Sequence, residues 1–511
     1  MKIKVPTLGI ALILLATAFS CSRPKKEKEI KHKEYPNIVL MMGDDHGWDE
    51  VGYNNHPFVE TPVLDEMAAS GLRFDRFYSG HPTCSPTRGS FLTGRHPNRY
   101  GTFTPGWSIR PEEITIAHLL KEAGYATAHF GKWHVGPVKK ESPTSPGAMG
   151  FDEWLSHDNF FEMNPVLSRN GETPQKIEGE GSEIIIEETI KFIQKSKEQE
   201  RPFMAVVWFG SPHEPYSGLP EDLALYENLP DSLANKKVRL TSNETGEQVN
   251  RPLRDVLQER YAEITAMDRS IGKLRTFLKE NNLKENTLVF YCGDNGTPAD
   301  AGRTGMTIRA QKASIYEGGV RVPGVIEWPA VIKNPASTSA ISVTSDLLPT
   351  LAEITGQSLP DRPLDGISLV PFFNDSKKQR TQPLCFWQFQ PGKVFDHSSQ
   401  PYIDPKLQEG TTPLVKMAAG KFTRDFKNYK YNKISENDFT GERSIIKDHY
   451  KLVVKELSTG SQESELYDIM KDPGEEKNLA GEYPDIVKEM QVELRKWQES
   501  VLNSLTGADY K

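Results

Sequence analysis

The chain has 511 residues, of which 37% are hydrophobic and 26% are charged, a composition typical of a globular protein with two or three domains. The formal net charge of -8 offers no broad cationic surface and excludes a general nucleic-acid binder. An anionic substrate would therefore need a local basic pocket.

The first twenty residues predict an export signal. Lysines precede an apolar run at residues 8–19, which is too short for a membrane span but suits a signal peptide. Cys21 follows small residues and resembles a bacterial lipobox cysteine, which is lipidated and becomes the mature N-terminus; ordinary secretion with cleavage near Ser20 is the alternative. Residues 21–35, rich in Lys and Glu, then form a solvated tether. We expect a periplasmic or cell-envelope protein, anchored by lipid to a bacterial outer membrane.

Strand-like runs alternate with amphipathic helices in residues 36–375, a pattern that predicts an α/β domain with a mostly parallel central sheet between helices. Apolar runs of the buried type predict the strands, and each ends in glycine or a small polar residue. The clearest strands are residues 37–42, 203–209 and 287–292, and the clearest helices are residues 62–72, 116–124 and 253–279.

The composition and the hydrophobic pattern of the sequence change after about residue 371. Polar, proline-punctuated segments surround a strand-like run at residues 450–455, and an amphipathic helix is predicted at residues 484–505. We therefore predict a smaller C-terminal α+β domain, residues 376–511, with an antiparallel sheet and a terminal helix. The four cysteines are too few for a disulfide framework: Cys21, Cys84, Cys292 and Cys385.

Acidic and amide side chains follow two of the predicted strands. Asp44 and Asp45 come just after the first strand, and Asp294 and Asn295 come just after the strand at 287–292. Ligands of open α/β sheets bind beyond the carboxyl ends of the strands, so these four side chains are candidates for one site. An all-oxygen set favours calcium or magnesium over zinc. The alternative is that they only form turns, which is less favoured because the pattern occurs twice.

The most specific segment is residues 84–95, Cys-Ser-Pro-Thr-Arg-Gly-Ser-Phe-Leu-Thr-Gly-Arg. An isolated cysteine would more often be a buried small residue. This segment, however, resembles the signature of type I formylglycine-dependent sulfatases, in which Cys-x-Pro-x-Arg directs oxidation of the Cys to formylglycine (3-oxoalanine). The resemblance implies that Cys84 is the precursor of the nucleophile. It also implies a formylglycine-generating or anaerobic sulfatase-maturing enzyme as a partner, and an alkaline-phosphatase-like fold.

The likeness to this family extends from Pro36 to about Leu479. Residues 131–134 (Gly-Lys-Trp-His), 212–215 (Pro-His-Glu-Pro) and 312–323 each resemble a family element. The resemblance implies one calcium ion, held by Asp44, Asp45, Asp294, Asn295 and the formylglycine at position 84.

The same resemblance implies roles for five further side chains. Arg88 would orient the hydrated aldehyde, while Lys132 and Lys312 would neutralise sulfate oxygens. His213, with Lys312, would protonate the leaving oxygen, and His134 would accept a proton from the remaining hydroxyl.

These implications predict a sulfuric ester hydrolase that removes sulfate from a sulfated carbohydrate, such as oligosaccharides of ulvan or carrageenan; glycosaminoglycan fragments are an alternative. A formylglycine phosphonate or phosphodiester hydrolase would share the nucleophile. A two-zinc phosphoesterase is disfavoured, because such enzymes typically have an Asp-His pair at the position where this chain has Asp294 followed by Asn295. A noncatalytic carbohydrate-binding lipoprotein is disfavoured because every motif position is present. We interpret His46 as structural, because neighbours on an extended segment point to opposite sides.

Overall fold

The structure is a computed structural model of the chain. It describes Met1 and residues 35–510, apart from residues 160, 162, 243–244, 302–307, 390–400, 411–424, 432 and 457–460. The predicted signal peptide, the candidate lipidation site Cys21 and all of the tether except Tyr35 lie outside the described residues. Residues 35–511 form one compact unit, and its description follows.

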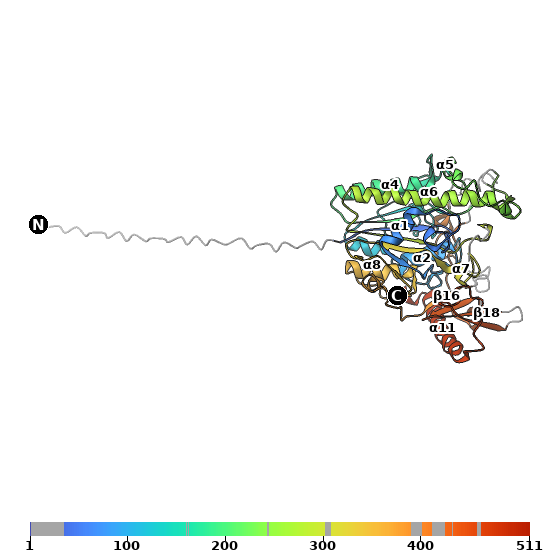
Figure 1. The fold of residues 1–511 in the computed structure, drawn as a ribbon. Helices are drawn as coiled ribbons and strands as arrows, with labels where there is room; N and C mark the ends of the chain where they lie inside the picture. The colour runs from blue at the N-terminus through green and yellow to red at the C-terminus, as the bar shows by residue number, and fades with distance from the viewer. Residues whose placement is uncertain are drawn as a thin grey trace. The chain divides into compact units, whose positions relative to one another are not determined.

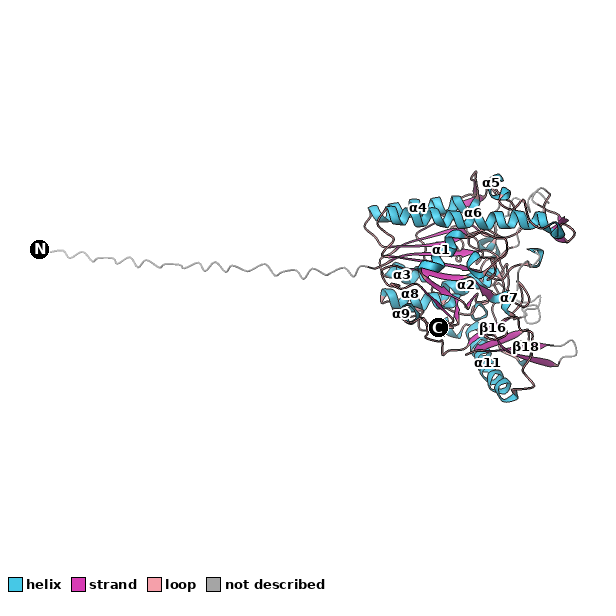
Figure 2. Cartoon of the chain, viewed as in Figure 1, coloured by secondary structure: helices cyan, strands magenta, loops and turns pink. Residues whose placement is uncertain are grey.

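A ten-stranded mixed sheet lies at the centre of this unit (Figures 1 and 2). Its strands, in spatial order, are β14 (Ala336–Thr338), β2 (Leu72–Phe74), β13 (Gly324–Glu327), β11 (Thr287–Gly293), β1 (Asn37–Gly43), β8 (Phe203–Trp208), β4 (Ala126–Lys132), β5 (Glu153–His157), β6 (Val166–Arg169) and β7 (Gln175–Lys176). From β11 to β5 the neighbouring strands are parallel, and β13 and β6 reverse the direction on either side. The carboxyl ends of five central strands therefore meet at one edge.

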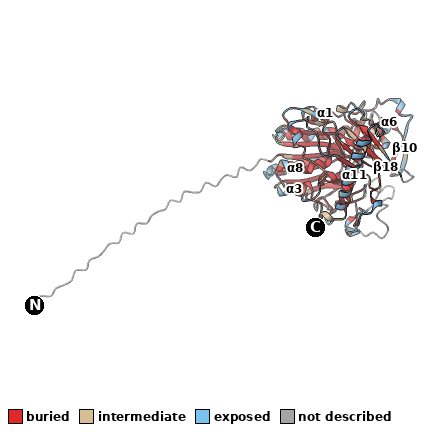
Figure 3. Ribbon diagram, turned by 90° about the horizontal axis from the view of Figure 1, so that it is seen from below, coloured by how far each residue is buried: buried red, intermediate tan, exposed pale blue. Residues whose placement is uncertain are grey.

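Helices cover both faces of the sheet, because its central strands are apolar on both sides. In β1, Ile38, Leu40 and Met42 pack into the hydrophobic cluster on one face, and Val39 and Met41 into the cluster on the other. Figure 3 shows these strands as buried. One face carries α1 (Pro62–Ser70), α4 (Gly181–Glu198) and α6 (Leu253–Glu280), and the other α2 (Cys84–Thr93), α3 (Ile116–Glu122), α8 (Leu347–Thr355) and α9 (Val370–Asn374).

Smaller elements complete the residues before 375. A three-stranded sheet flanks the carboxyl edge and consists of β12 (Arg321–Val322), β3 (Phe77–Tyr78) and β15 (Ser342–Val343). A hairpin flanks the same edge and consists of β9 (Lys237–Thr241) and β10 (Gln248–Pro252). The two short helices are α5 (Pro220–Ala224) and α7 (Glu317–Val320).

The C-terminal region is an antiparallel sheet with a long helix, α11 (Pro484–Leu505), against it (Figure 2). Its strands are β16 (Leu384–Trp387), β17 (Arg443–Lys447), β18 (Tyr450–Glu456) and β19 (Gln462–Asp468). Leu452 and Leu466 of the sheet pack with Met490 and Leu494 of the helix. The predicted boundary at 375/376 falls between α9 and β16, and stays a prediction.

The predicted fold class is confirmed, with one local correction. The helix predicted at 62–72 ends at Ser70, and Leu72 instead begins β2. Gly71 separates the two elements, and a Cβ there would lie 2.2 Å from the backbone oxygen of Ile326 in the neighbouring strand. Cys292 and Cys385 are buried free thiols. Among the described residues, no helix is both long and apolar enough to cross a membrane.

Candidate active site

The carboxyl edge of the parallel strands brings the predicted site residues together. Gly43 of β1 and Gly293 of β11 are partners in register, so Asp44 and Asp294 leave the sheet side by side. Lys132 is the last residue of β4, and the loop after β8 carries His213. The sheet thus gathers side chains that are up to 250 residues apart in the sequence.

A buried network of hydrogen bonds fixes the carboxylates of this site. The Asp45 backbone N–H donates to Oδ1 of Asp294 at 2.8 Å, and Nδ2 of Asn295 donates to Oδ1 of Asp45 at 2.8 Å. Asp45 has a φ of 61°, in the left-handed region. Such a conformation persists in a non-glycine residue when surrounding contacts hold it, and functional sites are where it concentrates.

Three cationic side chains oppose the carboxylates. Nζ of Lys132 lies 2.5 Å from Oδ2 of Asp44, and Nζ of Lys312 lies 2.5 and 2.6 Å from the two oxygens of Asp45. Arg88 donates to Oδ2 of Asp294 at 2.8 Å and lies 3.4 Å from Oδ1 of Asp44. The site therefore concentrates the positive charge that a sulfate or phosphate ester requires.

These neighbours set the acidity of the carboxyl groups. Burial alone would raise the pKa of Asp44, but Lys132 and the nearby cations hold it well below its usual range. Burial and the negative charge of Asp44 raise the pKa of Asp294 to about 7. Three carboxylates and three cations therefore share this buried space, and burial is the main reason why Asp294 binds its proton more tightly than usual.

Cys84 is the first residue of α2 and is buried beside the carboxylates. Its Sγ lies 3.8 Å from Oδ1 of Asp45. Burial raises the pKa of the Cys84 thiol, so that an unmodified cysteine would be neutral here at pH 7 and a poor nucleophile. Arg88 follows one helical turn later, which brings both side chains to the same end of the sheet.

Two histidines border the same cluster. Nε2 of His213 lies 3.7 Å from Oδ2 of Asp45, while Nδ1 lies 2.6 Å from the carbonyl oxygen of Glu214. A carbonyl can only accept, so Nδ1 carries the proton and Nε2 of the neutral ring faces the carboxylate. Burial lowers the pKa of His213 to about 4 and that of His134 well below its usual value. His134, with a φ of 57°, has a buried Nδ1 that receives no hydrogen bond from the described residues.

The donor set fits a hard cation. Oδ1 of Asp44 and Oδ1 of Asn295 are buried and make no hydrogen bond within the described part of the chain. Ligand atoms of Asp44, Asp45, Cys84 and His213 all lie within 4.8 Å of one another. Oxygen acceptors left unsatisfied in a carboxylate-rich cluster are suited to calcium or magnesium. Asp294, also predicted as a ligand, has its two oxygens engaged by Arg88 and the Asp45 N–H.

Two further residues of this region were not predicted from the sequence. Glu50 and Arg260 form a buried ion pair behind the site, with Nε of Arg260 2.7 Å from Oε1 of Glu50. The available signal was the place of Arg260 between Leu257 and Ile264, on the apolar face of α6. His46 has the structural place expected of it: its ring nitrogens contact the Tyr291 hydroxyl and the Glu50 carbonyl.

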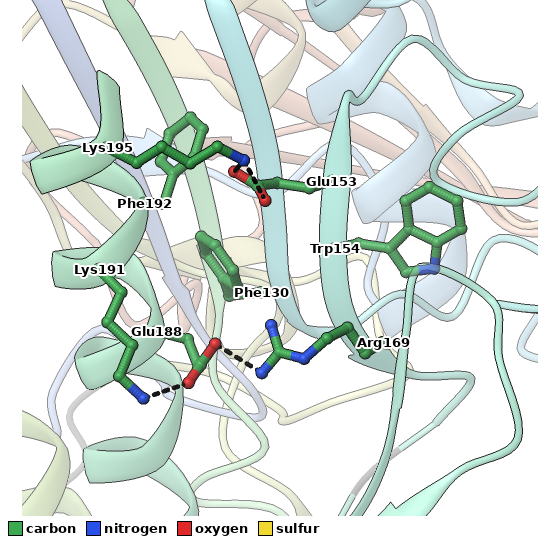
Figure 4. A pocket seen from close by; sticks show the side chains of 8 residues that line it. All are labelled: Phe130, Glu153, Trp154, Arg169, Glu188, Lys191, Phe192 and Lys195. Atoms are coloured by element: carbon green, nitrogen blue, oxygen red, sulfur yellow. Dashed lines mark hydrogen bonds and ion pairs between the residues drawn. The ribbon is translucent and has the colours of Figure 1, made fainter. Parts of the chain in front are cut away.

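A separate cavity of about 310 Å³ lies between α4 and strands β5 and β6 (Figure 4). Its charged groups are paired among themselves: Glu188 contacts both Arg169 and Lys191, and Lys195 contacts Glu153. With its charges satisfied, this cavity offers less to an anion than the carboxyl edge does.

Comparison with known proteins agrees with this geometry. A family model described as Sulfatase matches residues 36–357, well over half of the chain. The chain belongs to the sulfatase family. Membership confirms the family predicted from the Cys84 segment and the enzyme class, sulfuric ester hydrolase. The individual roles predicted for the site residues stay predictions.

Several named sulfatases resemble this chain. Arylsulfatase A of Homo sapiens is 29% identical over 512 residues, which cover 95% of this chain and 90% of the relative. Ulvan-active sulfatase of Formosa agariphila is 30% identical over 360 residues, or 69% of this chain and 68% of the relative. N-acetylgalactosamine-6-sulfatase of Canis lupus familiaris is 30% identical over 66% of this chain, and the match spans 65% of that relative's length.

Solved structures share the fold over nearly the whole chain. Ps i-CgsB, solved in complex with k-i-k-neocarrahexaose, has a TM-score of 0.71 at 23% identity, covering 93% of this chain and 94% of that one. Phosphonate Monoester Hydrolase of Agrobacterium radiobacter has a TM-score of 0.59 at 19% identity, covering 91% and 96%. The fold alone is therefore also found in an enzyme named for a reaction other than sulfate ester hydrolysis.

Proposed function

We propose that this sulfatase removes sulfate from a sulfated carbohydrate with a formylglycine made from Cys84 and a calcium ion at the carboxylate cluster. The observation that carries the proposal is the placement of Cys84, inside a complete modification signature, 3.8 Å from Oδ1 of Asp45. Unsatisfied oxygens of Asp44 and Asn295 support the metal.

The calcium ion and the formylglycine at position 84 would supply two kinds of chemistry. Calcium, held by Asp44, Asp45, Asp294 and Asn295, would add positive charge near the sulfate oxygens and the nucleophile. The hydrated aldehyde at position 84 would supply one hydroxyl as the nucleophile; loss of the proton from its second hydroxyl would re-form the aldehyde and expel sulfate together with the oxygen that attacked.

The chain's own side chains bind the ester and move the protons. Lys132 and Lys312 would bind sulfate oxygens, and Arg88 would orient the group at position 84. His213 would protonate the leaving oxygen from Nε2 together with Lys312; because Nδ1 already donates to the Glu214 carbonyl, the donor is the imidazolium form, in which Nε2 also carries a proton. His134 has an unpartnered Nδ1 among the described residues and would accept the proton of the remaining hydroxyl.

The first test uses protein co-expressed with a formylglycine-generating enzyme, with conversion at position 84 measured by peptide mass spectrometry. We expect this protein to hydrolyse an aryl sulfate. The activity should be lost after thorough chelation and should return with added Ca²⁺. Unchanged turnover after chelation would contradict the metal assignment. Faster hydrolysis of an aryl phosphonate or phosphodiester would favour the rival that shares the nucleophile. Full conversion with no activity on any sulfate ester would favour a noncatalytic binding protein.

For the substrate, we propose oligosaccharides of an algal polysaccharide, of the ulvan or carrageenan type. The supporting observations are the ulvan-active relative and the fold neighbour solved with a neocarrahexaose. The relatives named N-acetylgalactosamine-6-sulfatase keep glycosaminoglycan fragments as the second candidate. Free sulfate, measured across defined sulfated oligosaccharides of both classes, would decide between them.

We further propose that the protein is exported and anchored through a lipid on Cys21. The support is the sequence of residues 1–21 alone, which lie outside the described residues save for Met1. In a bacterial host, Cys21→Ser should move the protein from the membrane fraction to the soluble periplasm. An unchanged distribution would contradict lipidation.

A further inference from the structure

The buried pair of Glu50 and Arg260 lies directly behind the candidate active site. Arg260 projects from the first third of α6, has no exposed surface, and forms a bidentate pair with Glu50 at 2.7 and 2.6 Å. A buried pair is weak evidence for stability, because two charges must be taken out of water to form it. The other contacts of the pair therefore indicate what it does.

All five N–H groups of the Arg260 guanidinium have an acceptor. Besides Glu50, they donate to the backbone oxygen of Asp45 at 2.7 Å, to the backbone oxygen of Pro212 at 2.6 Å, and to the Tyr216 hydroxyl at 3.1 Å. This planar set of five donors is unique to arginine; lysine has three donors on one atom.

Glu50 extends the same network to another loop. Its Oε2 accepts from the hydroxyl of Thr297 at 2.9 Å and from the backbone N–H of Gly47 at 3.2 Å. Thr297 lies two residues after Asn295, in the loop that follows β11. The pair therefore bridges the loops after β1, β8 and β11, which carry Asp45, His213 and Asn295.

The contact with Asp45 stabilises a residue whose backbone conformation is unfavourable. Asp45 has its left-handed φ of 61°, and its two backbone polar groups are held from opposite sides: the N–H by Asp294 and the C=O by Arg260. The contact with Pro212 fixes the residue just before His213. Arg260 thus joins the backbone of Asp45 to that of the residue before His213, and the side chains of Asp45 and His213 lie 3.7 Å apart.

We propose that Arg260, held by Glu50, is a positioning residue that sets the geometry of the metal ligand Asp45 relative to the proton donor His213. This inference rests on the proposed function, because it assumes that Asp45 binds calcium and that His213 acts on the leaving group. Partners of metal ligands that themselves do not touch the metal typically change affinity or activity by about 10- to 100-fold when they are altered.

The test compares Arg260→Lys with a matched variant on the same helix. Arg275 also forms a bidentate buried pair, with Glu327 at 2.9 and 3.0 Å, but lies fifteen residues further along α6, roughly 22 Å away. Both substitutions keep the positive charge. Calcium affinity is measured by calorimetry on chelated, formylglycine-containing protein, together with kcat and KM on an aryl sulfate and the melting temperature.

We expect Arg260→Lys to weaken Ca²⁺ binding by about tenfold or more. Its kcat should stay low even at saturating Ca²⁺, because His213 also loses its support. Arg275→Lys should lower the melting temperature while leaving Ca²⁺ affinity and kcat within about twofold of the wild type.

Three other outcomes overturn the inference. Wild-type Ca²⁺ affinity and kcat in Arg260→Lys would refute it while leaving the proposed function intact. Equal losses in Arg260→Lys and Arg275→Lys would assign Arg260 a general structural role. A wild-type enzyme that binds no Ca²⁺ would remove the proposed metal site and this inference together.

Discussion

Asp45 shows how much of the site depends on a single residue. Its N–H donates to Asp294, its C=O accepts from Arg260, and its carboxylate contacts both Lys312 and Asn295. The left-handed conformation costs an L-residue roughly 1–2 kcal/mol, least for Asp and Asn. The surrounding contacts offset that cost, and they aim the carboxylate at the same space as the Cys84 side chain.

At the same scale, catalytic activity should depend on the conversion of Cys84 to formylglycine and not on the unmodified thiol. Because burial raises the thiol pKa, unmodified Cys84 would stay neutral and inactive at pH 7. Across preparations with different extents of maturation, kcat should rise in proportion to the formylglycine fraction and extrapolate to zero. Cys84→Ala should be inactive with a nearly unchanged melting temperature. A substantial kcat at zero formylglycine would contradict this prediction.

At the scale of elements, periodicity predicted the parts that local sequence determines. Strands β1, β8 and β11 and helix α6 are long, apolar or strongly periodic, and the structure has them within a residue or two of their predicted bounds. Short strands such as β2 and β13 exist through pairing with distant partners, which no local pattern encodes.

Contacts between distant residues likewise limited what could be predicted of the site. Its strand-end carboxylates and signature residues follow from local motifs, but the Glu50–Arg260 pair joins residues 210 positions apart. The capping of α1 is another example. Thr61 occupies the N-cap position without a capping hydrogen bond, and Asp268 of α6 accepts from the backbone N–H groups of Val63 and Leu64 instead.

The end of the signature helix allows a prediction about an element boundary. Gly94 ends α2 with a φ of 72°, and Gly124 follows α3 with a φ of 89°. A Cβ at Gly94 would lie 3.1 Å from Cβ of Leu348, whereas one at Gly124 would contact nothing within 4 Å. Gly124→Ala should therefore cost about 1 kcal/mol in unfolding free energy, from backbone conformation alone. Gly94→Ala should cost roughly 1–3 kcal/mol more, because α8 must move.

Chemical denaturation of both variants measures this difference. Gly124→Asn provides the control, since asparagine tolerates the left-handed region and should recover part of the loss. Equal destabilisation by the two alanine substitutions would show that packing against Leu348 contributes nothing.

At the scale of the whole molecule, the C-terminal helix α11 contacts the chain just after the signature segment. Arg99, four residues beyond the signature, donates to hydroxyls of Ser500 and Ser504 on α11, and Trp497 donates its indole N–H to Asp365 at 2.8 Å. Asp365 also pairs with Arg99 at 2.7 and 2.9 Å. The C-terminal region therefore does more than cover an edge: it holds the chain just after the helix that bears Cys84.

This junction should be sensitive to acid. Burial would raise the pKa of Asp365, but Arg99 holds it well below its usual value. Because the native carboxyl binds its proton more weakly than the unfolded one, its contribution is present above about pH 4 and is lost as the pH falls further. Asp365→Asn should cost roughly 3–5 kcal/mol at pH 7, since it leaves the charge of Arg99 buried without its partner.

Denaturation of wild type and Asp365→Asn between pH 8 and pH 3 checks both the size and the sign of the effect. The difference in unfolding free energy should be constant down to about pH 5 and shrink below pH 4, where the Asp365 carboxyl of the unfolded chain takes up a proton while the native carboxyl stays ionised. Asp361→Asn, at an exposed position of the same segment, should behave as wild type throughout. A difference that grows in acid would mean that the Asp365 carboxyl is protonated more readily in the native protein, and that Arg99 does not hold α11 through its charge.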